Sequence, residues 1–118
     1  MKKTSITLFI ALSGLFCTAQ KAATLQNDTL SYDGKQYFKG QSLQIGYGSG
    51  NNNEFTFVKA INTSFNFINC PADMAKTTGT VTRVYIEKGT AKISLKIDKA
   101  TYPLSILVEG AVDKKEIL

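Results

Sequence analysis

Apolar and polar residues alternate along two stretches in the first half of the chain. In 43–47 (LQIGY) and again in 55–57 (FTF), every second residue is a large apolar or aromatic one. A period of two is typical of a β-strand with one buried face. The residues between the stretches, 48–53 (GSGNNN), contain no core-forming side chain. The segment 39–58 therefore predicts a β-hairpin with an exposed polar loop, on which a small all-β domain is built.

Short segments with the same period recur along the chain, separated by turn residues. Asp33-Gly34 and Lys88-Gly89 read as tight hairpin turns, Asp-Gly being a dipeptide that tolerates positive φ. The alternation breaks in 81–87, which indicates a β-bulge or burial on both faces. About six to seven strands are expected. The candidate segments are 29–32, 35–38, 42–47, 54–59, 81–87, 91–97 and 102–108, and 62–69 reads as either a further strand or an extended edge.

The period changes at the C-terminal end. Ala111 and Val112 follow Val108 at i+3 and i+4, which predicts an amphipathic helix of one to two turns. Ile117 and Leu118 are expected to pack into the end of the domain. Short strands at regular turn spacing with one terminal helix favour a sandwich or a small barrel. The phenylalanines expected in its core are Phe55, Phe57, Phe65 and Phe67.

The first residues have the pattern of a secretory signal peptide. Lys2 and Lys3 precede an apolar run at 6–16, which is too short to span a membrane, and small residues precede Gln20. A lipoprotein signal with Cys17 as the acylated residue fits poorly, because the large Phe16 precedes it. We expect a signal peptide at 1–19, a flexible lead at 20–28 and one domain at 29–118. The exported protein would be periplasmic or extracellular, without a transmembrane segment.

The amino-acid composition limits the kinds of chemistry that are expected of this chain. The chain has no His and no Trp, so the commonest general base and metal ligand is missing. Removing Lys2 and Lys3 with the signal lowers the 14 basic residues to 12, against 9 acidic ones, a net charge of about +3. Arg83 is the single arginine, and arginine is the side chain best suited to phosphate and guanine. Nucleic-acid binding is therefore not expected.

Cys70 is the one cysteine beyond the predicted signal peptide, so the exported chain has no internal disulfide. It reads as a small buried apolar residue near a strand end. The alternative is a nucleophile, which usually needs a base such as His. A disulfide between Cys70 and another chain remains an alternative.

The glycine- and asparagine-rich loop has two further interpretations. Gly46, Gly48 and Gly50 resemble a phosphate-binding loop, but no helix follows and the Lys-Ser/Thr pair is missing. The stretch 51–54 (NNNE) offers one carboxylate, whereas calcium loops concentrate several. The other carboxylates are spread over turns and the tail. We expect no metal, no cofactor and no catalytic residues.

Tyrosines are better candidates for a binding surface than phenylalanines, since each presents an apolar ring with a polar tip. Tyr32, Tyr37 and Tyr47 are expected at the surface. If the domain has a ligand groove, the residues expected to line it are Tyr37, Tyr47, Ser49, Asn51, Asn52 and Asn53.

Four short motifs carry a resemblance to a family. They are 40–43 (GQSL), 46–49 (GYGS), 55–58 (FTFV) and a closing strand and helix at 104–117 that ends in KEI. Together they resemble small exported proteins of Gram-negative bacteria whose function is not known. The chain departs from the pattern at Gln41, where Asp is usual, and at Lys115, where Gly is usual.

This resemblance implies an SH3-like barrel outside the cytoplasm, without a known activity or catalytic residues. In such bacteria an Asp-Thr-aliphatic triplet can accept an O-linked glycan, and Asp28-Thr29-Leu30 has that form. The reading that follows is an exported, non-enzymatic binding module for an envelope protein, peptide or glycan. The alternatives are an accessory structural subunit of an envelope assembly and a small hydrolase that uses Cys70 or a carboxylate.

Overall fold

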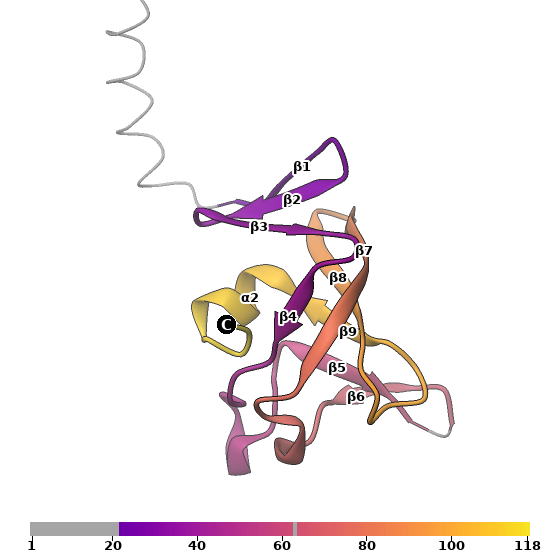
Figure 1. The fold of residues 1–118 in the computed structure, drawn as a ribbon. Helices are drawn as coiled ribbons and strands as arrows, with labels where there is room; N and C mark the ends of the chain where they lie inside the picture. The colour runs from indigo at the N-terminus through magenta and orange to yellow at the C-terminus, as the bar shows by residue number, and fades with distance from the viewer. Residues whose placement is uncertain (1–21, 63) are drawn as a thin grey trace, which may run out of the picture.

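A computed structural model describes residues 22–62 and 64–118. Within these ranges the chain forms two antiparallel sheets and one short α-helix near the C-terminus (Figure 1). The elements are β1 (Thr24–Gln26), β2 (Thr29–Tyr32), β3 (Lys35–Phe38), β4 (Ser42–Gln44), η1 (Asn51–Asn53), β5 (Val58–Ile61), β6 (Phe67–Asn69), η2 (Ala72–Met74), β7 (Thr78–Glu87), β8 (Thr90–Lys96), β9 (Leu104–Leu107) and α2 (Val108–Asp113). The predicted all-β class with a C-terminal helix is confirmed. The predicted signal peptide at 1–19, with Cys17, lies outside the described residues.

The smaller sheet is a meander in the order β1-β2-β3. Both residues of the Asp33-Gly34 turn have positive φ, 52° and 78°, as the predicted tight hairpin requires. Asn27 and Asp28 form a second such turn, with φ of 52° and 61°. This turn folds residues 24–26 back onto β2, where Leu25 pairs with Leu30. The expected lead at 20–28 therefore contains the first strand, which its weak periodicity did not indicate.

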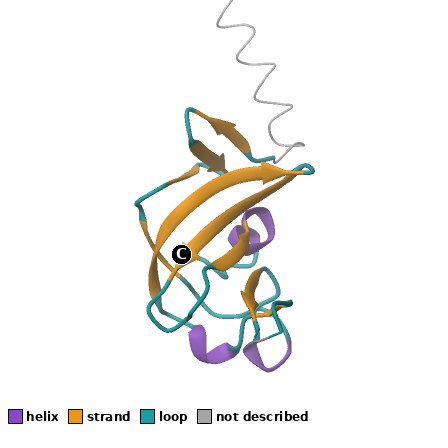
Figure 2. Ribbon diagram, turned by 90° about the vertical axis from the view of Figure 1, so that its right-hand side faces the viewer, coloured by secondary structure: helices purple, strands orange, loops and turns teal. Residues whose placement is uncertain are grey.

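The larger sheet has the order β4-β7-β8-β9-β5-β6. Figure 2 shows its long, curved strands in orange. β7 and β8 form its longest hairpin, closed by Lys88 and Gly89 with φ of 51° and 79°. The register shifts between Val81 and Arg83, so the predicted bulge in this strand is confirmed. Both sheets are open in their pairing order. No helix among the residues described is long and apolar enough to cross a membrane.

The expected hairpin at 39–58 is wrong. β4 pairs with β7, and β5 pairs with β9 and β6, so three strands separate the two arms. Ile45 forms an isolated bridge with Ile117 instead of continuing β4. Alternation correctly indicated extended backbone around 42–45, but pairing partners come from distant sequence. The residues between the arms form a long loop rather than a hairpin turn.

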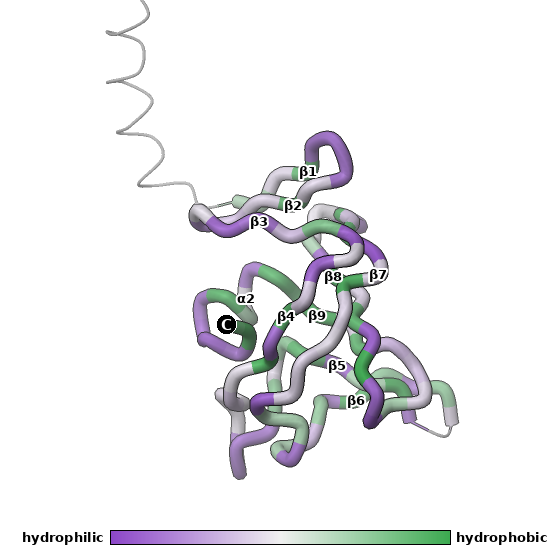
Figure 3. The backbone as a smooth tube through the Cα atoms, viewed as in Figure 1, coloured by the Kyte–Doolittle hydropathy of each residue, from purple (hydrophilic) through white to green (hydrophobic). Residues whose placement is uncertain are grey.

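The core lies between the inner face of the larger sheet, the helix and the smaller sheet. Ile93, Leu95, Leu104 and Ile106 point inward from β8 and β9, as their alternation predicts. In Figure 3, hydrophobic positions (green) gather where β9 leads into α2. The buried face of the helix, Val108, Ala111 and Val112, closes one side. Ile117 is buried as expected, whereas Leu118 is exposed.

Only part of the expected phenylalanine core is buried. Phe55 is fully buried and Phe57 packs against the core. Phe65 and Phe67 are 71% and 65% exposed, so their expected core position is wrong. Phe65 has a φ of 62° in the connection before β6, and Phe67 lies on an edge strand. The edge position leaves no second layer to cover these rings.

Candidate functional site

The loop between β4 and β5 is organised by one buried carboxylate. Glu116 follows α2 and is fully buried. Its Oε2 accepts hydrogen bonds from the Ser49 amide (3.0 Å), the Ser49 hydroxyl (2.5 Å) and the Thr56 amide (2.8 Å). Its Oε1 accepts one from the Phe57 amide (2.7 Å). A buried carboxylate with four donors is well satisfied, and here it fixes both ends of the loop.

Glycines allow the loop to pack closely around this anchor. A Cβ on Gly46 would lie 2.5 Å from the Lys115 carbonyl oxygen, and one on Gly48 would lie 2.1 Å from that of Asn53. The Gly46 amide also donates to the Glu116 carbonyl at 2.8 Å. These close approaches explain why glycines recur here, with no phosphate loop involved. The glycine spacing serves backbone packing.

The outer side of the loop presents tyrosine and asparagine side chains to solvent. Tyr47 is 64% exposed, and the Lys76 ammonium lies 5.6 Å from its ring centroid. Asn51, Asn52 and Asn53 form an exposed 3-10 turn in which Asn52 has a φ of 57°. An exposed tyrosine beside asparagines, serine and glycines is the composition of many binding loops.

Ser49 belongs to this loop but acts as its anchor, because both its amide and its hydroxyl donate to Glu116. The structure thus brings Tyr47, Ser49 and the three asparagines into one segment. The sequence missed Glu116, which holds them. Its only signal was its place in the closing KEI motif, where a charged residue precedes the buried Ile117.

Tyr37 lies elsewhere, and its expected exposure is wrong. It is on β3 in the smaller sheet, 2% exposed and paired across the strand with Leu30. Its hydroxyl has no hydrogen-bond partner among the described residues. Burial raises the pKa of this hydroxyl to about 12. Tyr32 is also buried, and its hydroxyl donates to Asp113 at 3.0 Å. Both tyrosines are therefore buried because they occupy inward-facing positions of their strands.

Cys70 is a free, fully buried thiol directly after β6. Burial, and then the charges of Asp73 and Glu116, raise its pKa to about 11. Its backbone joins the loop to the sheet: its carbonyl accepts from the Phe55 amide and its amide donates to the Val58 carbonyl. A buried protonated thiol suits packing better than nucleophilic attack. In the ranges described, no group of three or more Cys, Asp or Glu side chains could hold a metal ion.

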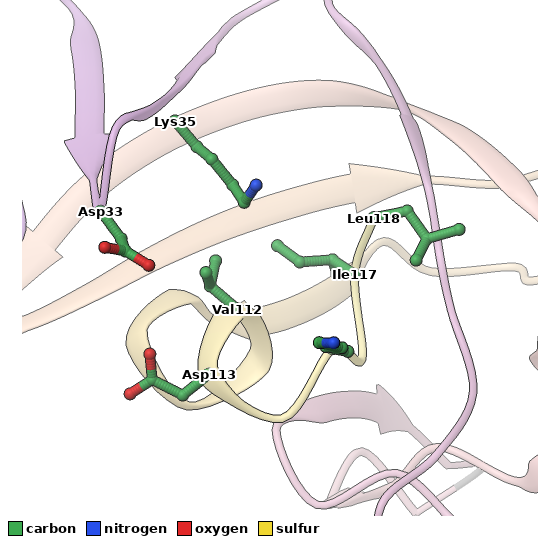
Figure 4. Close-up of a pocket in the computed structure, with 7 residues that line it drawn as sticks. Asp33, Lys35, Val112, Asp113, Ile117 and Leu118 are labelled. Atoms are coloured by element: carbon green, nitrogen blue, oxygen red, sulfur yellow. The ribbon is translucent and has the colours of Figure 1, made fainter.

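A pocket of about 560 Å³ lies between the β2–β3 turn, α2 and the C-terminal tail (Figure 4). Its lining combines side chains of both charges with apolar ones. The lining residues are Asp33, Lys35, Val112, Asp113, Lys115, Ile117 and Leu118. None of them is a predicted site residue. Balanced charges give the pocket no net attraction for an ion of either sign, so we assign it no ligand.

Comparison with known proteins adds no relative: no protein-family model, curated protein or solved structure matches the chain. Its function must therefore be inferred from its own residues.

Proposed function

We propose that this chain is an exported, non-enzymatic binding module whose contact surface is the loop 46–54. The observation that carries the proposal is the buried Glu116 carboxylate, which holds the loop backbone from inside. Tyr47 and the asparagines are left facing solvent. A loop already held in one shape loses less conformational entropy when a partner binds.

The chemistry of the loop suggests the class of partner. Tyr47 offers a large, rigid and amphipathic surface, and asparagine amides donate and accept hydrogen bonds. Lys76 adds a positive charge at the edge of the tyrosine ring. These groups suit a protein, peptide or glycan of the cell envelope.

Site-specific photo-crosslinking in the producing cells tests this proposal. A benzophenone amino acid replaces Tyr47, and a control carries it at Phe38, which is also exposed but lies on the smaller sheet. We expect a discrete adduct from position 47 and none from position 38. Equal adduct patterns, or none at either position, would refute the loop as the contact surface. A stoichiometric complex that survives purification would favour the accessory-subunit alternative.

We also propose export by cleavage after Ala19, supported by the basic and apolar pattern of the first residues. Mass spectrometry of the protein from fractionated cells tests this directly. The expected N-terminus is Gln20, in the periplasmic or extracellular fraction. The same spectrum tests Thr29, which is half-buried beside the Asn27-Asp28 turn, as a glycan acceptor.

Finally, we propose that the larger sheet is an SH3-like barrel closed through the C-terminal tail. The support is a circuit of contacts: Ile117 bridges Ile45 beside β4, and Glu116 binds residues directly before β5. An experimental structure tests this closure. Water filling the space between β5 and the tail would contradict it.

A further inference from the structure

Strand β6 lies at the end of the molecule away from the smaller sheet (Figure 1). On β6 and the connections next to it in space, three aromatic side chains are exposed, and we call them the aromatic tip: Phe65, Phe67 and Tyr102. They come from the β5–β6 connection, β6 and the connection before β9. The rings of Phe65 and Tyr102 meet edge to face, with centroids 5.7 Å apart. Exposed aromatic clusters of this kind mark interaction surfaces.

The strand register places Phe67 on the same face as a row of polar and basic residues. Directly opposed residues of antiparallel strands project from one face of a sheet. The pairings that cross the outer face give the row Asn69, Lys59, Ser105, Ser94 and Arg83. Phe67 lies two residues before Asn69 in β6 and therefore points outward with it. Lys92 and Lys96 flank Ser94 in β8 and also point outward.

This outer face is positively charged. Its cations are Lys59, Arg83, Lys92 and Lys96. Glu87 is the single carboxylate at the outward positions of β5 to β9, and it pairs with Lys92 at 2.9 Å. That pair is neutral overall. Lys96 and Arg83 are exposed. Cations beside exposed aromatic rings form an amphipathic surface.

We propose that this surface docks on an anionic lipid bilayer, with the aromatic tip in the interfacial layer and the outer-face cations against the headgroups. Aromatic rings are favoured at the membrane interface, and nearby lysines and arginines add electrostatic attraction to anionic lipid. The attachment is peripheral. It uses no residue of the loop 46–54 and goes beyond the proposed function.

Two other occupants fit less well. A second copy of the chain would bring two positively charged faces together, which opposes association. A soluble anionic polysaccharide would satisfy the cations and leave the outward Phe67 and its neighbours in water. A bilayer accounts for the charge and the aromatic tip together.

Vesicle sedimentation tests the proposal with the purified protein. Vesicles of phosphatidylcholine alone are compared with vesicles that also contain phosphatidylglycerol. We expect binding to the anionic vesicles, weakening as salt rises. Lys59→Gln with Lys96→Gln should reduce the partition coefficient about 25-fold, since each cation near the surface contributes about fivefold. Phe65→Ser with Phe67→Ser should weaken sedimentation with the anionic vesicles, and it should leave Tyr102, the remaining ring of the aromatic tip, open to an aqueous quencher when vesicles are present.

Matched variants separate this surface from net charge and from the loop. Lys35→Gln with Lys114→Gln removes two exposed cations elsewhere and should change binding less than about twofold. Tyr47→Ala should leave vesicle binding unchanged. The membrane proposal and the proposal for the loop 46–54 can therefore fail independently of each other. Circular dichroism melting confirms that each variant is folded. The inference is overturned by absent vesicle binding, by an equal loss in the lysine control, or by retention on heparin or dimerisation without vesicle binding.

Discussion

Two Phe-x-Phe segments in this chain, 55–57 and 65–67, have the same alternating pattern and opposite environments. In the first, Phe55 is buried, and the amides of Thr56 and Phe57 donate to Glu116. In the second, both rings are exposed at the edge of the larger sheet. The pattern is local, whereas the carboxylate that binds the backbone of the first segment lies about 60 residues away. Burial here is decided by long-range partners.

The largest loss of stability is expected at Phe55, the buried ring of the first segment. Phe55→Ala should lower the free energy of unfolding by about 3–5 kcal/mol, because it leaves a cavity in the core. Phe67→Ala is the matched control and should change it by less than about 0.5 kcal/mol. Urea denaturation measures both. Equal losses would show that the two segments are alike in solution.

The second-largest loss of stability is expected when the Glu116 carboxylate, which anchors the loop, is replaced. Glu116→Gln replaces an accepting oxygen with a donating NH₂, so at least one of its four donors loses its acceptor. We expect a loss of about 2–3 kcal/mol, and faster amide exchange at Ser49, Thr56 and Phe57. Glu54→Gln, an exposed carboxylate in the same loop, is the control. Amide exchange that is unchanged in Glu116→Gln would show that this carboxylate does not hold the loop in place.

Tyr37 tests the converse case, a buried group without a partner. Tyr37→Phe should stabilise the protein by about 1 kcal/mol, because the wild-type hydroxyl is buried unpaired. Its folded pKa is raised from 10.0 to about 12. The neutral form is therefore favoured in the folded state, and stability is lost as pH rises from about 10 to 12.

Denaturation curves at several alkaline pH values measure both parts of this prediction. Tyr37→Phe should lose less stability than the wild type between about pH 10 and 12, and Tyr47→Phe, at an exposed tyrosine, should match the wild type. Parallel curves for the wild type and Tyr37→Phe would mean that the hydroxyl finds a partner.

The smallest effect concerns the one ring contact of the exposed segment. A double-mutant cycle on Phe65 and Tyr102 should give a coupling below about 0.5 kcal/mol, since both rings stay in water. Thermal unfolding of the single and double variants to Ala supplies the cycle. A coupling well above that value would mean that the aromatic tip is a packed part of the domain.

Local signals predicted most of the secondary structure. The turns at Asp33-Gly34 and Lys88-Gly89, the bulge in β7 and the inward residues of β8 depend on neighbours within a few positions. The amphipathic helix follows from the spacing of Val108, Ala111 and Val112. These features need no knowledge of distant sequence.

The remaining errors have two physical causes. Alternation shows that a strand has two unlike faces, and it does not say which strand lies beside it, so the pattern of 39–58 suggests a hairpin that does not form. The polar tip of tyrosine suggests a surface position for Tyr37, but residue type does not say which face of β3 is covered by the rest of the fold. For the candidate site, the sequence located the loop and most of its members. It did not locate Glu116, because a lone glutamate in a tail is ordinarily exposed.

The Glu116 anchor also has a kinetic consequence. The turns of β2–β3 and β7–β8 join near neighbours, so these hairpins can form within microseconds. The bonds to Ser49, Thr56 and Phe57 close a span of 59 to 67 residues and require the tail to be in place. We therefore expect the loop to become ordered late on the folding pathway, after the rate-limiting barrier. Weakening its anchor should accelerate unfolding while leaving the folding rate almost unchanged.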